Sequence, residues 1–144
     1  MIRQAEKEDS RVLAEMAVCM WDSHTTAELE MEFAQTIEEG QEVFFIQYQD
    51  QTPVGFAQCS MRSDYVEGTE SSPVGYLEGI FVDEAHRRQG CARKLLAACE
   101  EWAKKMGCSE FASDCELDNR ASLSFHLSMG FEEANRIICF TKKL

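Results

Sequence analysis

The segment from residue 74 to residue 106 constrains the fold most, because a strand-like run leads through a basic, glycine-containing turn into an amphipathic helix. Residues 74–82 carry the most strand-like apolar density of the chain. Residues 90–106 space their apolar side chains three and four apart, and Gly107 follows them as a helix stop. A strand that runs directly into a helix indicates a sheet covered by helices, which is an α/β layered domain.

The remaining chain shows the same two periodicities. Apolar residues at helical spacing predict helices over residues 10–21, 25–40 and 119–129, and Thr25 with Glu28 forms a capping box before the second of these. Strands are predicted from the shorter apolar runs over residues 1–5, 43–48, 54–62, 111–114 and 136–142, with Phe131 as a further strand position and residues 50–53 as a hairpin turn. No repeat, linker or low-complexity tract interrupts the pattern, so we expect residues 1–144 to form one domain.

The charge of the chain limits its partners. It has 14 Lys+Arg against 26 Asp+Glu, a net charge of −12, which excludes a nucleic-acid binder because such a protein needs a basic surface. Polycations would be attracted to it, although an acidic surface can also serve solubility alone. No apolar run reaches the roughly 20 residues that cross a bilayer, and the start of the chain is too charged for a secretory signal. We therefore expect a cytoplasmic protein with no membrane partner.

The seven cysteines are an odd number, and no two of them form a C-x-x-C pair. This pattern excludes a regular disulfide framework and a zinc ribbon, so no metal site is expected. Most of the cysteines are predicted to be small buried hydrophobic residues in a reducing compartment.

The turn before the third predicted helix is unusually basic, with Arg87, Arg88, Arg93 and Lys94 around Gly90. Helix N-termini carry partial positive charge and normally favour Asp or Glu, so these cations are unfavourable there unless an anion binds. Glycine lets the backbone approach closely, and free N–H groups at a helix start can hold a diphosphate. The alternative is a basic, solvated helix start. The nucleotide-binding patterns G-x-x-x-x-G-K-[ST] and G-x-G-x-x-G are both absent.

The pattern R-x-x-G-x-A over residues 87–92 resembles the coenzyme loop of the GNAT superfamily of N-acetyltransferases, and the helix opened by Asn119 and closed by Gly130-Phe131 is similar to its second signature. The resemblance implies a mixed, mostly antiparallel twisted sheet flanked by about four helices. It also implies acetyl-CoA as co-substrate, with the pantetheine arm along residues 78–82. The residues implied at the coenzyme are Ile80, Phe81, Val82, Arg87, Arg88, Gln89, Gly90, Cys91, Ala92, Arg93, Asn119 and His126.

A narrower resemblance covers nearly the whole chain and includes Trp21-Asp-Ser-His24, Asp64-Tyr65 and the segments 77–82 and 112–114. These segments are similar to the aminoglycoside 6'-N-acetyltransferases, which implies acetyl transfer to the 6'-amine of these antibiotics, and thereby resistance. The residues implied in the drug pocket are Trp21, His24, Tyr65, Glu78 and Asp114. The resemblance further implies a homodimer in which Asn135, where an acid is typical, reaches the drug site.

Three positions are predicted to carry the chemistry. Direct attack by an amine requires a base, and Glu78 and Asp114 are the two candidates, with no assignment between them. A carboxylate within the apolar strand 74–82 is costly to bury without a partner or a task, and Gly79 beside it indicates a β-bulge. His126 occupies the position at which the superfamily often has a tyrosine acid, so it is predicted either to protonate the leaving thiolate or to hydrogen-bond to the coenzyme.

Each pocket residue also has a structural alternative. Trp21 suits a core position, His24 an exposed cap, Tyr65 a loop anchor and Asp114 a turn cap. Two other functions remain open at this point. One is a GNAT enzyme acting on a polyamine or a protein lysine, and the other is a module that binds acetyl-CoA without catalysis.

Overall fold

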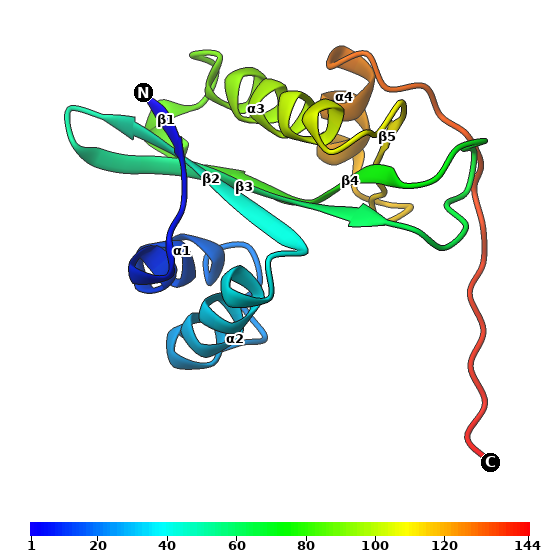
Figure 1. Cartoon of the computed structure of the whole chain (residues 1–144), viewed down its shortest axis with the longest axis horizontal. Coiled ribbons are helices and arrows are strands. Elements are labelled where there is room, and N and C mark those ends of the chain that lie inside the picture. Colours follow the sequence, from blue (N-terminus) through cyan, green and yellow to red (C-terminus); the bar gives the residue numbers. More distant parts are fainter.

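A five-stranded sheet with the order β1-β2-β3-β4-β5 separates two helical layers in the computed structural model, which describes residues 1–144 (Figure 1). The strands are β1 (Ile2–Gln4), β2 (Glu42–Gln49), β3 (Thr52–Arg62), β4 (Val74–Val82) and β5 (Phe111–Ala112). The helices are α1 (Ser10–Ala17), α2 (Thr26–Glu39), α3 (Cys91–Lys105) and α4 (Arg120–Ser128), with the short 3-10 turns η1 (Lys7–Asp9) and η2 (Glu84–His86). The predicted fold class is confirmed.

Strands β1 to β4 pair antiparallel, whereas β4 and β5 pair parallel. The hairpin between β2 and β3 turns through Asp50 and Gln51, which both have positive φ angles of 48° and 66°. Two left-handed residues match the twist of a tight hairpin, so β3 begins at Thr52, earlier than the sequence predicts. The parallel pairing with β5 covers only Gly75 with Phe111 and Tyr76 with Ala112.

Each helical layer has its own apolar core. Helices α1 and α2 cover one face of the sheet, and α3 with α4 covers the other (Figure 1). The fully buried large side chains of the first core are Leu13, Phe33, Phe44, Ile46 and Phe56. The second core is built around Ala57, Cys59, Leu77, Leu95, Leu96 and Cys99. Alternating residues of β3 therefore contribute to both cores, which is the periodicity expected of a central strand.

The ends of α1 and α2 set the positions of the residues between them. Helix α1 ends at Ala17, four residues earlier than predicted, and turns through residues 18–24 follow it. The Thr25 side chain accepts a hydrogen bond from the Glu28 N–H at 3.2 Å, and Gly40 ends α2 with a φ of 73°. The Gly40 stop and the Thr25 side-chain cap agree with the sequence prediction, whereas the second hydrogen bond of the predicted capping box, from the Thr25 N–H to the Glu28 side chain, is not formed. None of the helices combines the length with the apolar composition that crossing a membrane would require.

Two sequence predictions are wrong. Residues 131–144 contain no strand, and the segment extends away from the body of the fold (Figure 1). Its apolar side chains lie in solvent, with Ile138 79% and Phe140 87% exposed, because no strand within the chain pairs with it. The other concerns the cysteines, all of which are free. Only three are buried, namely Cys59, Cys99 and Cys108, because the others lie in turns, at a helix start or in the C-terminal segment.

Candidate active site

Strand β4 contains a β-bulge at the residue that the sequence analysis singled out. In the register between β3 and β4, Gln58 pairs with Gly79 and Cys59 pairs with Leu77, so Glu78 has no partner. The extra residue changes the alternation of side chains and increases the local twist. The bulge predicted from Gly79 is confirmed, and it turns the Glu78 side chain toward polar neighbours on β3.

Three hydrogen-bond donors on β3 hold the Glu78 carboxylate. Ser60 Oγ donates to Oε1 at 2.6 Å, and the Arg62 guanidinium donates from Nη2 to Oε1 and Oε2 at 2.9 and 3.0 Å and from Nε to Oε1 at 3.1 Å. Glu78 is the less accessible partner, with its side chain 23% exposed against 42% for Arg62. The partner that a carboxylate in an apolar strand requires is therefore a bidentate arginine.

The same arginine connects Glu78 to the second candidate base. The guanidinium carbon of Arg62 lies 3.5 Å from the centroid of the Tyr76 ring, and the Tyr76 hydroxyl donates a hydrogen bond to Asp114 Oδ2. Burial and the neighbouring Asp114 raise the pKa of Tyr76 well above its usual range, so the phenol keeps its proton at neutral pH. Glu78, Arg62, Tyr76 and Asp114 thus form one continuous chain of polar contacts, which we call the carboxylate bridge.

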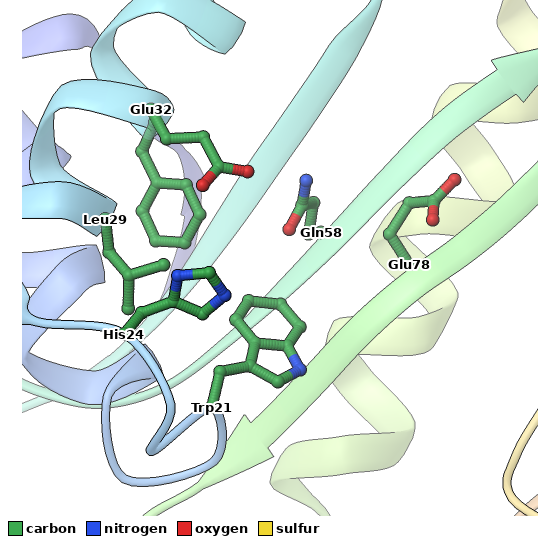
Figure 2. Close-up of a pocket in the computed structure, with 7 residues that line it drawn as sticks. Trp21, His24, Leu29, Glu32, Gln58 and Glu78 are labelled. Carbon is green, nitrogen blue, oxygen red and sulfur yellow. The ribbon is translucent and has the colours of Figure 1, made fainter. Parts of the chain in front are cut away.

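A pocket of about 250 Å³ opens on the side of Glu78 that faces the first helical layer. Figure 2 shows His24 and Glu32 on one side of this pocket and Glu78 on the other, with Gln58 between them in the view. The pocket is lined by Trp21, His24, Leu29, Glu32, Phe33, Gln58 and Glu78. The lining contains two carboxylates and no lysine or arginine. An aromatic, acidic pocket of this kind suits an amine-bearing cation.

Trp21 is both a core residue and a wall of the pocket, so the two alternatives considered for it are compatible. Its ring packs edge-on against Phe33 and Phe56, with centroids 6.3 Å apart in each pair. It also covers Gly79, where a Cβ atom would lie 2.7 and 2.8 Å from two carbons of the indole. Real Cβ contacts are not this short, so the bulge must carry a glycine for Trp21 to reach its position.

Replacing Gly79 by Ala is therefore expected to displace the Trp21 ring and to destabilise the protein by about 1 to 3 kcal/mol, the usual cost of overpacking. Urea unfolding measures the loss, and the fluorescence of Trp21 in a Trp102→Phe background reports the movement of the ring. In a Trp21→Ala background the same substitution should cost much less. If Gly79→Ala lowers the free energy of unfolding equally in both backgrounds, the effect arises from the backbone of β4 and not from contact with Trp21.

Two pocket residues, Glu32 and Gln58, were missed by the sequence analysis. Glu32 follows Glu28 by one helical turn on the polar face of α2, and Glu28 lies 3.6 Å from His24 in an i,i+4 pair. This spacing of His24, Glu28 and Glu32 is a signal that could have been noticed. Gln58 had no comparable signal, because its place in the pocket depends on the bulge opposite it.

Three residues that were predicted at the drug site do not line this pocket, namely Tyr65, Asp114 and Asn135. Tyr65 is 78% exposed, and its hydroxyl lies 3.4 Å from Glu67 Oε2. Asn135 donates to the other oxygen of Glu67 at 2.9 Å. Tyr65 and Asn135 therefore meet at Glu67, on the loop between β3 and β4. Glu110 anchors the same loop by accepting hydrogen bonds from the backbone N–H groups of residues 70 and 71 at 2.9 and 2.8 Å.

The basic turn adopts the conformation that an anion site at a helix start requires. Gly90 is the N-cap of α3 with a φ of 83°, and no side chain caps the helix. The first turn contains no acidic residue, and a Cβ at Gly90 would meet nothing within 4 Å. Arg87 instead folds back, with its Nε donating to the Val82 carbonyl at 3.0 Å. The first N–H groups of α3 therefore lack side-chain acceptors, while cationic side chains surround them.

The edge of β4 toward β5 has no strand partner beyond Tyr76. Pairing with β5 ends there, so residues 77–82 have no strand partner on that side, although the Leu77 and Val82 carbonyls accept hydrogen bonds from Ser113 Oγ and Arg87 Nε. Ile80, Phe81 and Val82 lie on this edge, directly before the basic turn. Free N–H and C=O groups on a strand edge can pair with an extended ligand.

His126 lies at the end of this edge, in contact with a serine that the sequence analysis did not name. Its Nδ1 lies 2.7 Å from the Ser122 carbonyl, which can only accept, so Nδ1 carries the hydrogen. Nε2 lies 2.8 Å from Ser113 Oγ, and Ser113 Oγ in turn lies 3.3 Å from the Leu77 carbonyl. The Asn119 side chain accepts from the Ser122 N–H at 3.1 Å and caps α4. His126 is thus held in one orientation toward Ser113.

The chain is similar to known acetyltransferases over nearly its whole length. Residues 9–131 match the model of the Acetyltransferase (GNAT) family. An aminoglycoside N(6')-acetyltransferase type 1 of Acinetobacter haemolyticus is 38% identical over 143 residues, which are 99% of this chain and 98% of the relative. A protein of the same name from Klebsiella aerogenes is 37% identical over 100% of this chain and 97% of its own.

Solved structures agree with these sequence matches. AAC(6')-Iy in complex with the bisubstrate analogue CoA-S-monomethyl-acetylneamine superposes with a TM-score of 0.94 at 35% identity, covering 100% of this chain and 98% of the other. The 6'-N-acetyltransferase AAC(6')-IG of Acinetobacter haemolyticus gives a TM-score of 0.94 at 39% identity, with 100% and 99% coverage. With its sheet, bulge and basic turn arranged as described, the chain belongs to the GNAT family of acetyltransferases.

Proposed function

We propose that this protein transfers the acetyl group of acetyl-CoA to the 6'-amine of aminoglycosides and thereby confers resistance to them. The observation that carries this proposal is the position of Glu78. The residue lies at the β4 bulge, where the acidic, tryptophan-walled pocket meets the strand edge that leads to the basic turn. Aminoglycosides are polycations. Glu78 is paired with Arg62, but Glu32 has no lysine or arginine partner, so the pocket keeps a negative charge that favours them electrostatically.

The start of α3 supports the coenzyme site that we propose. Uncapped N–H groups, the open surface at Gly90 and the absence of first-turn acids suit a diphosphate. We assign this contact to Arg87, Arg88 and Gln89 with the first turn of α3, and the pantetheine contact to the edge at Ile80, Phe81 and Val82. When bound, the coenzyme supplies an activated acetyl thioester. The residues of this chain bind and orient the coenzyme and the amine substrate, and they move the protons.

Asp114 is the better candidate for the base. Glu78 already accepts four hydrogen bonds, three of which come from Arg62. Asp114 accepts only the Tyr76 hydroxyl through Oδ2, which leaves Oδ1 free to accept a proton from the substrate ammonium. In this assignment Glu78 binds an ammonium group, while Trp21 and His24 form the pocket wall beside it. Tyr65 and Asn135 remain further candidates for substrate contact from the loop and from a partner chain.

We propose that the Ser113 hydroxyl gives its hydrogen to the leaving coenzyme sulfur while His126 Nε2 donates a proton to Ser113 Oγ, which restores the hydroxyl. A proton donor must be protonated before transfer, so this role predicts a kcat that falls on the alkaline side of its pH profile. We expect His126→Ala and Ser113→Ala to remove this falling limb from the kcat profile and to lower kcat about tenfold at its optimum. A falling limb that persists in both variants would rule out this role.

The C-terminal segment supports a homodimer. Ile137, Ile138 and Phe140 are largely exposed on an extended backbone without a pairing partner within the chain, and such a segment can pair with a second copy. We propose that two chains associate through residues 136–142. Sedimentation equilibrium of the full chain and of an Ile138→Lys variant tests this proposal. A monomeric full chain would contradict it.

We also propose that the protein acts in the cytoplasm, where acetyl-CoA is available. All seven cysteines are free, although Cys19, Cys115 and Cys139 are exposed. Exposed free thiols are typical of a reducing compartment.

Release of thiol from acetyl-CoA tests the proposed function. Kanamycin and tobramycin, which carry a 6'-amine, should be acetylated, whereas an aminoglycoside with a 6'-hydroxyl should not. Turnover of spermine or a lysine peptide alone would favour the GNAT enzyme acting on another amine. Coenzyme binding by calorimetry without turnover of any amine would favour the non-catalytic module.

A further inference from the structure

Arg62 is the one cation in contact with the pocket carboxylate Glu78, in a chain whose net charge is −12. It is the last residue of β3, so its side chain can swing outward into the loop without breaking a strand pair at the centre of the sheet. Its guanidinium holds Glu78 through three hydrogen bonds and stacks on Tyr76, but its side chain remains 42% exposed. The ion pair is well formed and open to solvent at the same time.

We propose that Arg62 is a displaceable counter-ion, which neutralises Glu78 until an ammonium group of the substrate takes its place on that carboxylate. The inference rests on the proposed function and specifies how that site selects its substrate. Only a ligand that replaces the positive charge can compensate Glu78 once Arg62 has moved, because a partly buried carboxylate is costly to leave unpaired. Arg62 is then a specificity residue that disfavours neutral groups at this position.

Competition of this kind lowers the apparent affinity for the substrate. A site that is blocked most of the time binds with its intrinsic dissociation constant divided by the open fraction. For a pair that is closed roughly 80% of the time, as the usual strength of exposed ion pairs gives, the apparent affinity is about fivefold weaker than that of the open site. Weakening the pair should therefore improve substrate binding.

Calorimetric titration of kanamycin into the full-length protein and its variants tests the proposal. We expect Arg62→Ala to lower the dissociation constant for kanamycin about fivefold. Arg62→Lys should lower it about twofold, because lysine keeps the positive charge but loses the bidentate hydrogen bonds to Glu78 and the stacking on Tyr76. Arg11→Ala removes the same charge from α1, where Arg11 pairs with Glu15 and Glu30, and should leave the constant within twofold. In a Glu78→Gln background, Arg62→Ala should give no gain.

Two results would overturn the proposal. Weaker binding by both Arg62→Ala and Arg62→Lys would show that Arg62 positions Glu78 for the substrate. Equal gains in kanamycin affinity from Arg62→Ala and Arg11→Ala would show that the effect comes from the net charge of the protein and not from the pair with Glu78. Thermal denaturation confirms that each variant is folded. If the wild type does not acetylate kanamycin, the proposed function is wrong but the role of Arg62 is still testable. Spermine also carries ammonium groups, so its titration into the same variants measures the displacement of Arg62.

Discussion

Replacing Asp114 by Asn is expected to lower kcat/KM for a 6'-amino aminoglycoside by about 10²- to 10³-fold, within the usual contribution of a general base. The amide oxygen of Asn can still accept the hydrogen bond that the Tyr76 hydroxyl donates, so the contact that holds the side chain is kept. Only the capacity to accept a proton is lost. Steady-state kinetics at saturating acetyl-CoA measures the effect, and raising the pH should recover part of the activity by deprotonating the amine in solution.

Two neighbouring variants separate this role from those of the other bridge residues. Tyr76→Phe keeps the Asp114 carboxylate and the ring under Arg62 but removes the donor, so we expect less than a tenfold change. Glu78→Gln removes the charge that binds an ammonium and should act mainly by raising KM. Wild-type kinetics in both Asp114→Asn and Glu78→Gln would remove the carboxylates from the mechanism.

The local features of this site could be predicted from the sequence because they depend on neighbours along the chain. A strand, a glycine turn and a helix that follow one another fixed the expected position of the basic turn, and the structure has Gly90 as the N-cap of α3. The Thr25 cap and the bulge beside Gly79 were predictable for the same reason. In each case one or two residues impose a backbone conformation on the next few.

The partners of the Glu78 carboxylate were not predictable in this way. Arg62 and Ser60 lie on β3, sixteen and eighteen residues before Glu78, and reach it only through the register that the bulge creates. Ser113 meets His126 because β5 ends after two residues. The C-terminal segment has the sequence of a strand, but a strand also needs an edge to pair with, and periodicity does not report whether the same chain supplies one.

The second large effect is expected from Arg93→Glu at the start of α3. Arg93 is the third residue of the helix, exposed and without a hydrogen-bond partner in the chain. A carboxylate at this position interacts favourably with the helix dipole, so the free protein should gain about 0.3 to 1 kcal/mol. The same carboxylate repels a bound diphosphate, and the change of two charges at close range should raise the KM for acetyl-CoA roughly 10²-fold. Urea unfolding and initial rates measure the two effects.

The opposite end of the same helix provides a charge-matched control. Lys105→Glu also changes the net charge by two, but it places an acid in the last turn of α3, where Lys104 and Lys105 now favour the dipole. We expect this variant to be less stable than the wild type and to keep its KM for acetyl-CoA. Arg93→Glu should thus be more stable but bind the coenzyme weakly, whereas Lys105→Glu should be less stable but bind it normally. A general folding defect cannot explain this pair of results. Similar KM values for the two variants would mean that the α3 start does not bind the diphosphate.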